Sequence, residues 1–219
     1  MTTALVTGGN KGIGLAIVRQ LAARGTVVYL GSRDFDRGRA AAADIDGDVR
    51  PLRLDVTSAA DIAGAVAAVG SLDVLVNNAG VHSADDDMRF VYATNVFAVV
   101  DMIDAFLPLL RRSRAGRIVN VSSMRGSLGE EGAWVGQPSM SYSSSKTALN
   151  AITVHYARSL KDSGIKVNGA APGHVATDFN GFRGTRTPDE GAAVAVRLAT
   201  LGPDGPTGVV IQDDRVLAW

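Results

Sequence analysis

Short apolar runs, rich in β-branched residues, alternate along the chain with longer alanine-rich segments in which apolar residues recur at helical spacing. The short runs predict strands and the longer segments predict helices. Strands are expected over residues 4–7, 26–30, 49–54, 73–76, 117–121, 165–168 and 208–211. Helices are expected over residues 13–23, 37–45, 94–110, 141–160 and 188–201, with another starting at Ser58. This alternation predicts one doubly wound α/β domain over residues 1–219, with a parallel sheet of about seven strands and helices on both faces.

Composition excludes several classes of function. The 219 residues carry no net formal charge, so the charge balance favours neither a nucleic acid nor an anionic membrane as partner. Cysteine is absent, which rules out disulfides and cysteine-based catalysis and fits a reducing cytoplasm. No uninterrupted apolar stretch approaches the ~18 residues of a membrane span, and the first residues reach glycine too early for a signal peptide. We therefore expect a soluble, cytoplasmic protein.

The first expected strand runs directly into a glycine-rich stretch, Thr7-Gly-Gly-Asn-Lys-Gly-Ile-Gly14, which is followed at once by a helix. The glycines allow a tight turn and a close approach of the backbone to a pyrophosphate, while the helix N-terminus supplies free N–H donors. The position after the first strand of an alternating chain is the context that this motif requires. A purely structural turn is the alternative. The residues predicted to hold the dinucleotide here are Gly8, Asn10, Lys11, Gly12, Ile13 and Gly14.

The residues at the tip of the second expected strand are predicted to determine whether the protein binds NAD(H) or NADP(H). In dinucleotide-binding folds an acidic residue at this tip binds the ribose 2′-hydroxyl of NAD and repels the extra phosphate of NADP. Here no carboxylate precedes Arg33, and Arg37 follows one helical turn later, with Lys11 in the loop itself. Guanidinium groups match phosphate oxygens in pairs, so these cations favour NADP(H). The alternatives are that all three are solvated surface cations, or that Asp34 binds the ribose.

Tyr142 and Lys146 are the candidate acid/base pair. Their spacing of four residues places a phenol and an ammonium one above the other on a helix face. Upstream, Ser122 and Ser123 follow an expected strand, and Asn95 stands at the expected start of a long helix. Groups at the carboxyl ends of parallel strands gather around the ligand crevice. The sequence therefore predicts a polar catalytic site beside the dinucleotide.

These motifs resemble those of the short-chain dehydrogenase/reductase family, and within it the carbonyl reductases. The resemblance rests on the residues already quoted and on further stretches along nearly the whole chain. These are Val6–Arg19, Arg33-Asp34, Leu54-Asp55, Asp73–Gly80, Asn120–Ser123, Ala171–Gly173, Thr177-Asp178, Pro188–Gly191 and the terminal Trp219. The resemblance implies a single-domain Rossmann fold and an NADP(H)-dependent oxidoreductase.

The resemblance also implies roles for individual residues. Asn95, Ser123, Tyr142 and Lys146 are expected to form a catalytic tetrad. The expected cofactor contacts are Asp55 and Val56 at the adenine, Asn78 on the ribose side, Lys146 at the nicotinamide ribose, Tyr142 beside it, and Val175 and Thr177 at the nicotinamide amide. The preference for Ser123 over Ser122 comes from the family pattern, because the sequence alone does not separate them.

The residue types suit carbonyl reduction. A free phenol has a pKa of ~10, and a neighbouring ammonium together with the positive nicotinamide of the oxidised cofactor is expected to lower it. Tyr142 then protonates the oxygen of a ketone, aldehyde, dione or quinone whose carbon accepts hydride. Ser123 donates a hydrogen bond to the same oxygen. Lys146 is also expected to hold ribose hydroxyls, and Asn95 to anchor a water that leads to solvent.

The remaining polar and apolar candidates carry weaker signals. His82, His155 and His174 lack the spacing of metal ligands, so no metal site is expected. The acidic run Asp85–Asp87 is interpreted as a solvated loop. Possible substrate contacts are Met124, Trp134, Val135 and Phe179.

Two short segments distinguish this chain from the mammalian carbonyl reductases. Only residues 124–141 separate Ser123 from Tyr142, where those enzymes carry a long insertion that covers their pairing helices. We therefore expect a homodimer or homotetramer. The stretch 180–187 is also short and predicts an open substrate pocket. Alternative functions are a ketoacyl-carrier-protein reductase or an alcohol dehydrogenase of the same family, or, in another class, an NADP(H)-sensing regulator without turnover.

Overall fold

A computed structural model describes all residues, 1–219, and contains one eight-stranded sheet with the strand order β3-β2-β1-β4-β5-β6-β7-β8. The strands are β1 (Thr3–Val6), β2 (Val27–Ser32), β3 (Val49–Arg53), β4 (Val74–Asn77), β5 (Arg117–Val121), β6 (Lys166–Ala170), β7 (Val210–Gln212) and β8 (Arg215–Val216). The first seven are parallel, and β8 is antiparallel to β7. The predicted parallel sheet is confirmed. The eighth strand was not predicted, because a two-residue strand has no periodicity to detect.

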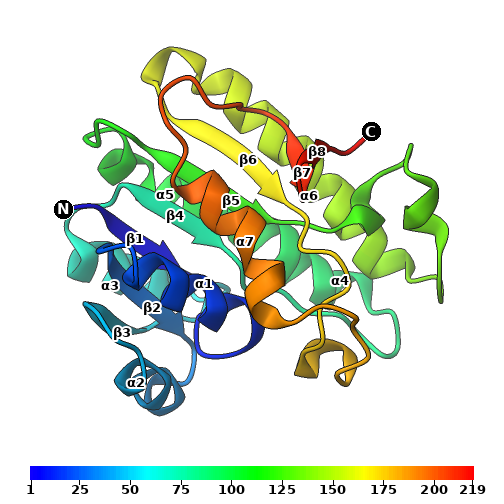
Figure 1. Ribbon diagram of the computed structural model, residues 1–219, viewed down its shortest axis with the longest axis horizontal. Helices are drawn as coiled ribbons and strands as arrows, with labels where there is room; N and C mark the ends of the chain where they lie inside the picture. Colours follow the sequence, from blue (N-terminus) through cyan, green and yellow to red (C-terminus); the bar gives the residue numbers. More distant parts are fainter.

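Helices cover both faces of the sheet, as Figure 1 shows. They are α1 (Gly12–Ala22), α2 (Phe35–Ala43), α3 (Ala59–Val69), α4 (Met88–Tyr92), α5 (Ala98–Leu110), α6 (Met140–Ser159) and α7 (Pro188–Ala199). Each face has its own apolar core. Ile17 and Leu21 of α1 pack with Val196 of α7 on one face, and Ile103 and Phe106 of α5 pack with α3 and α6 on the other. The doubly wound arrangement therefore follows from the apolar strands, which bury both of their faces.

The long helix before β5 differs from the prediction. It is continuous from Met88 to Leu110, so it begins six residues before the expected start at residue 94. Residues Ala93–Phe97 form one π-helical turn inside it. The sequence prediction missed the signal for this earlier start, the helix-capping Asp87 directly before Met88. By length and composition the 23-residue helix could cross a membrane, but half of its most apolar window is buried within this fold, where it is a core helix.

The strand order places the candidate site. The chain reverses direction across the sheet between β1 and β4, because β2 and β3 lie on one side of β1 and the later strands on the other. Loops diverge at such a switch point and leave a crevice at the carboxyl ends of the strands. The glycine-rich loop after β1, the segment after β4 and the serines after β5 all meet at this edge.

Candidate active site

The glycine-rich loop has the backbone conformation that a dinucleotide cradle needs. Gly8 and Gly12 have φ values of 62° and 55°, a region that favours glycine. A Cβ on Gly14 would lie 2.3 Å from the carbonyl oxygen of Gly8, so no larger residue fits there. Lys11 precedes α1 without capping it through its side chain, which leaves the first N–H groups of the helix for an anion. Half-buried Asn10 and Ile13 complete the loop. These residues fit the pyrophosphate of a dinucleotide.

Asn78, which follows β4, braces this loop. Its side-chain amide donates to the carbonyl oxygens of Thr7 (2.9 Å) and Gly8 (3.1 Å). The Thr7 hydroxyl in turn accepts the backbone N–H groups of Asn78 and Ala79, each at 3.0 Å. The side-chain N–H groups of Asn78, which was expected on the ribose side, thus bind the glycine-rich loop itself. Its contact with a ribose remains a prediction.

The tip of β2 presents one unpaired cation. Asp34 caps α2 by accepting the backbone N–H of Arg37 at 3.1 Å, and its carboxylate also pairs with the Arg37 guanidinium at 3.2 Å. Arg33 is exposed and forms no salt bridge. The Asp34 carboxylate thus has two partners, whereas Arg33 forms no salt bridge at this strand tip.

Asp55 and Val56 lie after β3, at the neighbouring strand end. Asp55 accepts hydrogen bonds from the hydroxyl (2.7 Å) and the backbone N–H (2.9 Å) of Thr57, and these bonds lower the pKa of its carboxyl. Its backbone N–H donates to Asp61 at 3.0 Å, which fixes the turn into α3. Val56 is buried. The pair therefore lies at the strand end next to the tip of β2, and its contact with an adenine stays a prediction.

Tyr142 and Lys146 project from the first two turns of α6 toward the carboxyl end of β5. The Lys146 Nζ lies 5.7 Å from the centre of the Tyr142 ring and donates to the carbonyl oxygen of Val121 at 2.8 Å. Lys146 is buried and Tyr142 is half-buried. The predicted juxtaposition of a phenol and an amine is therefore present in the structure.

The structure separates the two serines that the sequence left open. The hydroxyl of Ser122 is buried and donates to Asn150 Oδ1 in the interior of α6. Ser123 is half-buried, its hydroxyl accepts the backbone N–H of Arg125 at 3.2 Å, and the same hydroxyl lowers the pKa of the Tyr142 phenol. Ser123 is therefore the serine that faces the tyrosine.

The electrostatics of the pair differ from the expectation. Burial raises the pKa of the Tyr142 phenol, whereas the Ser123 hydroxyl and the positive charge of Arg125 lower it. Burial also lowers the pKa of Lys146 to about 8. The expected lowering of the tyrosine pKa by the lysine charge is thus not found in the protein alone, because burial dominates both groups. The groups that do favour phenolate are Ser123 and Arg125.

Asn95 lies in the π-helical turn of the long helix and is buried. Its side chain accepts the backbone N–H of Val81 at 2.8 Å, and donates to the Val81 carbonyl oxygen (2.9 Å) and to Ser145 Oγ (3.1 Å). The extra residue of a π turn re-aims a side chain, and such turns often mark functional sites. Asn95 therefore ties the segment after β4 to α6, although the sequence predicted it at a helix start.

Residues 174–187 fold over the glycine-rich loop as a lid. Val175 and Thr177 are buried, and Thr177 Cγ2 lies 3.3 Å from the position of a Cβ on Gly12. Lys11 pairs with Asp178 across the loop. The lysine that was expected to meet the 2′-phosphate is thus bound to the lid.

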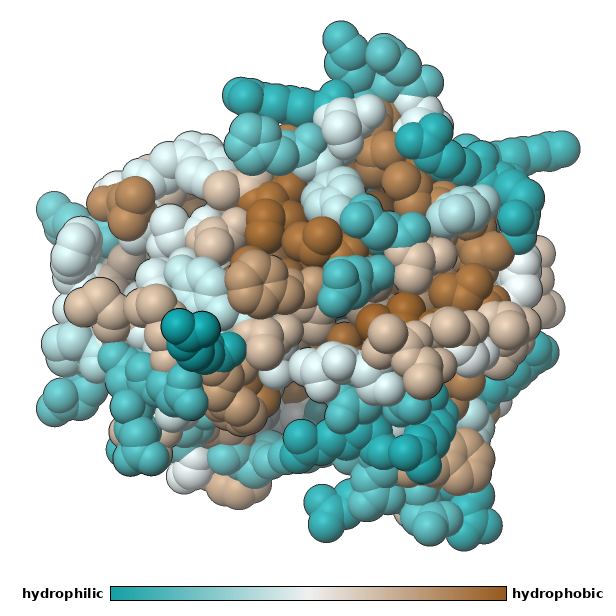
Figure 2. All heavy atoms as spheres, turned by 180° about the vertical axis from the view of Figure 1, so that it is seen from behind, coloured by the Kyte–Doolittle hydropathy of each residue, from teal (hydrophilic) through white to brown (hydrophobic).

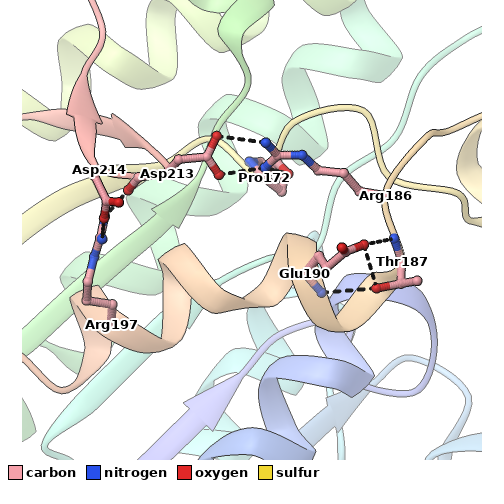
Figure 3. A network of polar contacts seen from close by, with 7 residues as sticks. All are labelled: Pro172, Arg186, Thr187, Glu190, Arg197, Asp213 and Asp214. Carbon is pink, nitrogen blue, oxygen red and sulfur yellow. Dashed lines mark hydrogen bonds and ion pairs between the residues drawn. The ribbon is translucent and has the colours of Figure 1, made fainter.

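The β7–β8 turn holds the far end of this lid, a connection that the sequence did not suggest. The carboxylate of Asp213 accepts one hydrogen bond from each terminal nitrogen of the Arg186 guanidinium. On its other side Asp214 pairs with Arg197 of α7 (Figure 3). Thr187 and Glu190 form a capping box at the start of α7 in the same view. Contacts at Asp178 and Arg186 therefore tie this segment to the glycine-rich loop and to the β7–β8 turn, and the open substrate pocket stays a prediction.

The apolar candidates partly surround the tyrosine. The ring of Phe179 lies 5.7 Å from the Tyr142 ring, and His82 meets Phe179 edge-on at 4.8 Å. Trp134 and Val135 are exposed on the loop before α6, and Met124 is half-buried beside it. No group of three histidine or carboxylate side chains is placed so that it could hold a metal ion.

The acidic run Asp85–Asp87 is exposed, as expected of a solvated loop, but two of its three side chains also form specific hydrogen bonds. Asp87 caps α4 by accepting the backbone N–H of Phe90 at 3.1 Å. Asp86 accepts hydrogen bonds from the start of α6. The cap at Asp87 had a sequence signal, an aspartate directly before a helix. The contact between Asp86 and Ser141 joins residues 55 positions apart, so no local sequence signal indicated it.

Comparison with known proteins identifies the class. A family model described as short chain dehydrogenase matches residues 2–187. The chain therefore belongs to the short-chain dehydrogenase/reductase family, as the resemblance predicted, and is an oxidoreductase. It is 36% identical to the short-chain dehydrogenase anuI of Penicillium roqueforti, over 97% of this chain and 94% of that protein.

Carbonyl reductases are among its relatives. The chain is 34% identical to human carbonyl reductase [NADPH] 1, over 99% of this chain and 98% of that protein. The structure of the NADPH-bound carbonyl reductase from chicken fatty liver superposes with a TM-score of 0.87 at 29% identity, covering 100% of this chain and 99% of that one. The human alignment spans 273 positions, more than the 219 residues here, so that relative carries insertions that this chain lacks.

Proposed function

We propose that this enzyme is an NADPH-dependent reductase of ketones, aldehydes, diones or quinones, with Tyr142 as proton donor. The observation that carries the proposal is the stack of Tyr142 and Lys146 on α6, with the Ser123 hydroxyl at the phenol. This group lies at the same sheet edge as the glycine-rich loop. The bound dinucleotide supplies the hydride.

The protein residues provide the rest of the chemistry. As negative charge develops on the carbonyl oxygen, Ser123 donates a hydrogen bond to it and Tyr142 transfers a proton. The positive charge of Arg125 favours the phenolate left on Tyr142. Lys146 and Tyr142 line the nicotinamide side of the crevice. Asn95 keeps the segment after β4 in place. Phe179 shields the tyrosine from water on one side.

The test is NADPH oxidation with a panel of ketones, quinones, diones and a ketoacyl thioester. The wild-type enzyme is expected to oxidise NADPH with at least one of these classes. Tyr142→Phe is expected to lose two to four orders of magnitude in kcat, about the value of general-acid catalysis, while it still binds NADPH. Near-normal turnover of Tyr142→Phe would refute the assignment. Tight NADPH binding without any turnover would favour the sensing regulator.

The preference for NADPH is proposed from Arg33, the free cation at the tip of β2. Its guanidinium is available to a 2′-phosphate, whereas the neighbouring Asp34 is held by Arg37. Arg33→Ala is expected to raise the KM for NADPH about tenfold and to leave that for NADH unchanged, since one charge-assisted contact contributes ~1.5 kcal/mol. Arg39→Ala is the control, because Arg39 is exposed and pairs with Asp36 on the same helix. Equal effects on both dinucleotides would contradict the proposal.

A homodimer or homotetramer is proposed as the assembly, in a reducing compartment such as the cytoplasm. Phe90 and Phe97 are 51% and 62% exposed on the helix that runs from Met88 to Leu110. The face turned away in Figure 1 carries brown hydrophobic patches among hydrophilic residues (Figure 2). Exposed aromatic side chains on helices are typical of interfaces. Light scattering at micromolar concentration is expected to give at least twice the 22.7 kDa of the chain, and a monomer would contradict this.

A further inference from the structure

The segment between β4 and α4 reaches across to the start of α6, the helix that carries Tyr142. One carboxylate oxygen of Asp86 accepts the backbone N–H of Ser141 at 2.9 Å and the hydroxyls of Ser139 (3.1 Å) and Ser141. The other accepts the backbone N–H of Met140 at 3.0 Å. A single side chain thus holds two of the first N–H groups of α6, which have no partner inside the helix. These bonds lower the pKa of the Asp86 carboxyl, so it is ionised at neutral pH.

Tyr142 is the next residue in this arrangement. Its backbone N–H donates to Ser139 Oγ at 3.3 Å, and the same hydroxyl donates to Asp86. The carboxylate therefore fixes the backbone on which the phenol is mounted. It also places a negative charge at the positive end of the helix dipole, where such a charge is stabilising.

The segment that carries Asp86 is itself fixed at both ends. Asn95 binds the backbone N–H and carbonyl of Val81 at its start, and Asp87 caps α4 at its end. Asp86 has a φ of 53°, an uncommon conformation for a residue other than glycine. Such a conformation persists when the surrounding contacts determine it, and it is frequent at functional sites. His82 of the same segment meets Phe179, which in turn contacts the Tyr142 ring.

We propose that Asp86 is a positioning residue for Tyr142, which sets the phenol at the substrate oxygen by fixing the start of α6 from outside the helix. The inference rests on the proposed role of Tyr142 as proton donor. It makes the carboxylate part of the reaction geometry, although Asp86 itself touches neither substrate nor dinucleotide. The competing explanation is a helix cap that contributes stability alone.

The test uses variants that separate the carboxylate from the backbone conformation. Asp86→Gly removes the carboxylate and retains the left-handed backbone without strain. Asp86→Asn keeps one acceptor oxygen and also tolerates this conformation. Asp85→Asn is the control, since Asp85 is exposed and makes no side-chain hydrogen bond. Each is examined by amide hydrogen exchange of Met140, Ser141 and Tyr142, by NADPH binding, and by steady-state kinetics.

Asp86→Gly is expected to lose exchange protection at the start of α6 alone and to lower kcat 10- to 100-fold, the scale of a ~1 Å misplacement. The Kd for NADPH is expected to stay within twofold of the wild-type value. In exchange protection and in kcat, Asp86→Asn is expected to lie between Asp86→Gly and the wild type. Unchanged protection overturns the proposal, and so does lost protection with an unchanged kcat, because the bonds would then serve stability alone. A wild-type enzyme without turnover would refute the proposed function, while the exchange result would still decide whether Asp86 orders the start of α6.

Discussion

Arg186 and Asp213 join the lid to the β7–β8 turn through two parallel hydrogen bonds, Nη1 to Oδ1 and Nη2 to Oδ2, each 2.7 Å long (Figure 3). The two residues are 27 positions apart in the sequence. Arg186 also pairs in a β-bridge with Val175, and Asp213 holds a left-handed backbone with a φ of 52°. A turn at the edge of the sheet therefore fixes the segment that closes over the glycine-rich loop.

Weakening this ion pair is expected to affect the KM for NADPH more than kcat. Asp213→Asn keeps the shape and tolerates the left-handed backbone but loses the charge. The side chains are 31% and 55% exposed, so solvent screens the pair and its contribution is about 0.5–1 kcal/mol. The KM for NADPH is therefore expected to rise about two- to fivefold with kcat nearly unchanged, and the difference should shrink at high salt.

Asp214 provides the matched control for this prediction. It is the next residue in the same turn, but its partner Arg197 lies on α7 and not on the lid. Asp214→Asn is expected to leave the KM for NADPH unchanged. An equal rise in both variants would show that the turn, and not its contact with Arg186, affects the cofactor.

The two serines after β5 are expected to respond to substitution in opposite ways. Ser123→Ala removes the hydroxyl that acts on Tyr142, and is expected to lower kcat about 10²-fold with little change in stability. Ser122→Ala leaves the buried Asn150 oxygen without its donor, which costs about 1–3 kcal/mol of unfolding free energy. Denaturant unfolding and steady-state kinetics of the two variants measure both effects. Reversed results would exchange the roles of the serines.

Replacing two helical glycines with alanine, one at the glycine-rich loop and one far from it, tests whether the loop binds the dinucleotide. A Cβ on Gly14 of α1 would lie 2.3 Å from the Gly8 carbonyl oxygen and 2.4 Å from Asn78 Nδ2, so the loop has to shift. Gly14→Ala is expected to cost about 1–3 kcal/mol of stability and to abolish measurable NADPH binding. Gly64 of α3 faces open space, and Gly64→Ala is expected to raise the free energy of unfolding by about 0.5–1 kcal/mol. Thermal unfolding and NADPH titration of both variants test this, and NADPH binding by Gly14→Ala would contradict the cradle.

The sequence predicted those features whose signal is local. The parallel sheet followed from apolar runs such as residues 73–76, and the cradle from glycines at fixed spacing after a strand. The spacing of Tyr142 and Lys146 predicted their shared helix face, which the structure bears out. In each case the physical cause acts within about one helical turn or one strand, so neighbouring residues were sufficient to reveal it.

Features that depend on long-range contacts could not be predicted. Asp86 and the start of α6 are joined only in the folded chain, as are Arg186 and Asp213. Lys11 has the charge expected of a phosphate ligand, but its partner Asp178 comes from the lid. The tyrosine pKa was misjudged for a related reason, because burial depends on the whole fold and outweighs a nearby charge.

The buried ammonium of Lys146 is expected to make stability depend on pH. The side chain is 5% exposed, and burial lowers its pKa from 10.5 to about 8. Between these two values the unfolded chain binds more protons than the folded one, so this group makes unfolding free energy rise with pH. Below pH 8 the full cost of burying the charge is present, and above pH 10.5 it has disappeared. Lys146→Met removes this cost of burying a charge, together with the amine that we propose for the active site.

Lys146→Met is therefore expected to be inactive but more stable than the wild type at pH 7, by at most about 3 kcal/mol, since each pKa unit corresponds to 1.36 kcal/mol. The loss of the bond to the Val121 carbonyl offsets part of this gain. Denaturant unfolding of both proteins at pH 7, 8.5 and 10 measures the difference, which should narrow as the pH rises through this range. A gap that stays constant would mean that Lys146 keeps its proton throughout, and that its charge is stabilised in the folded protein rather than penalised by burial.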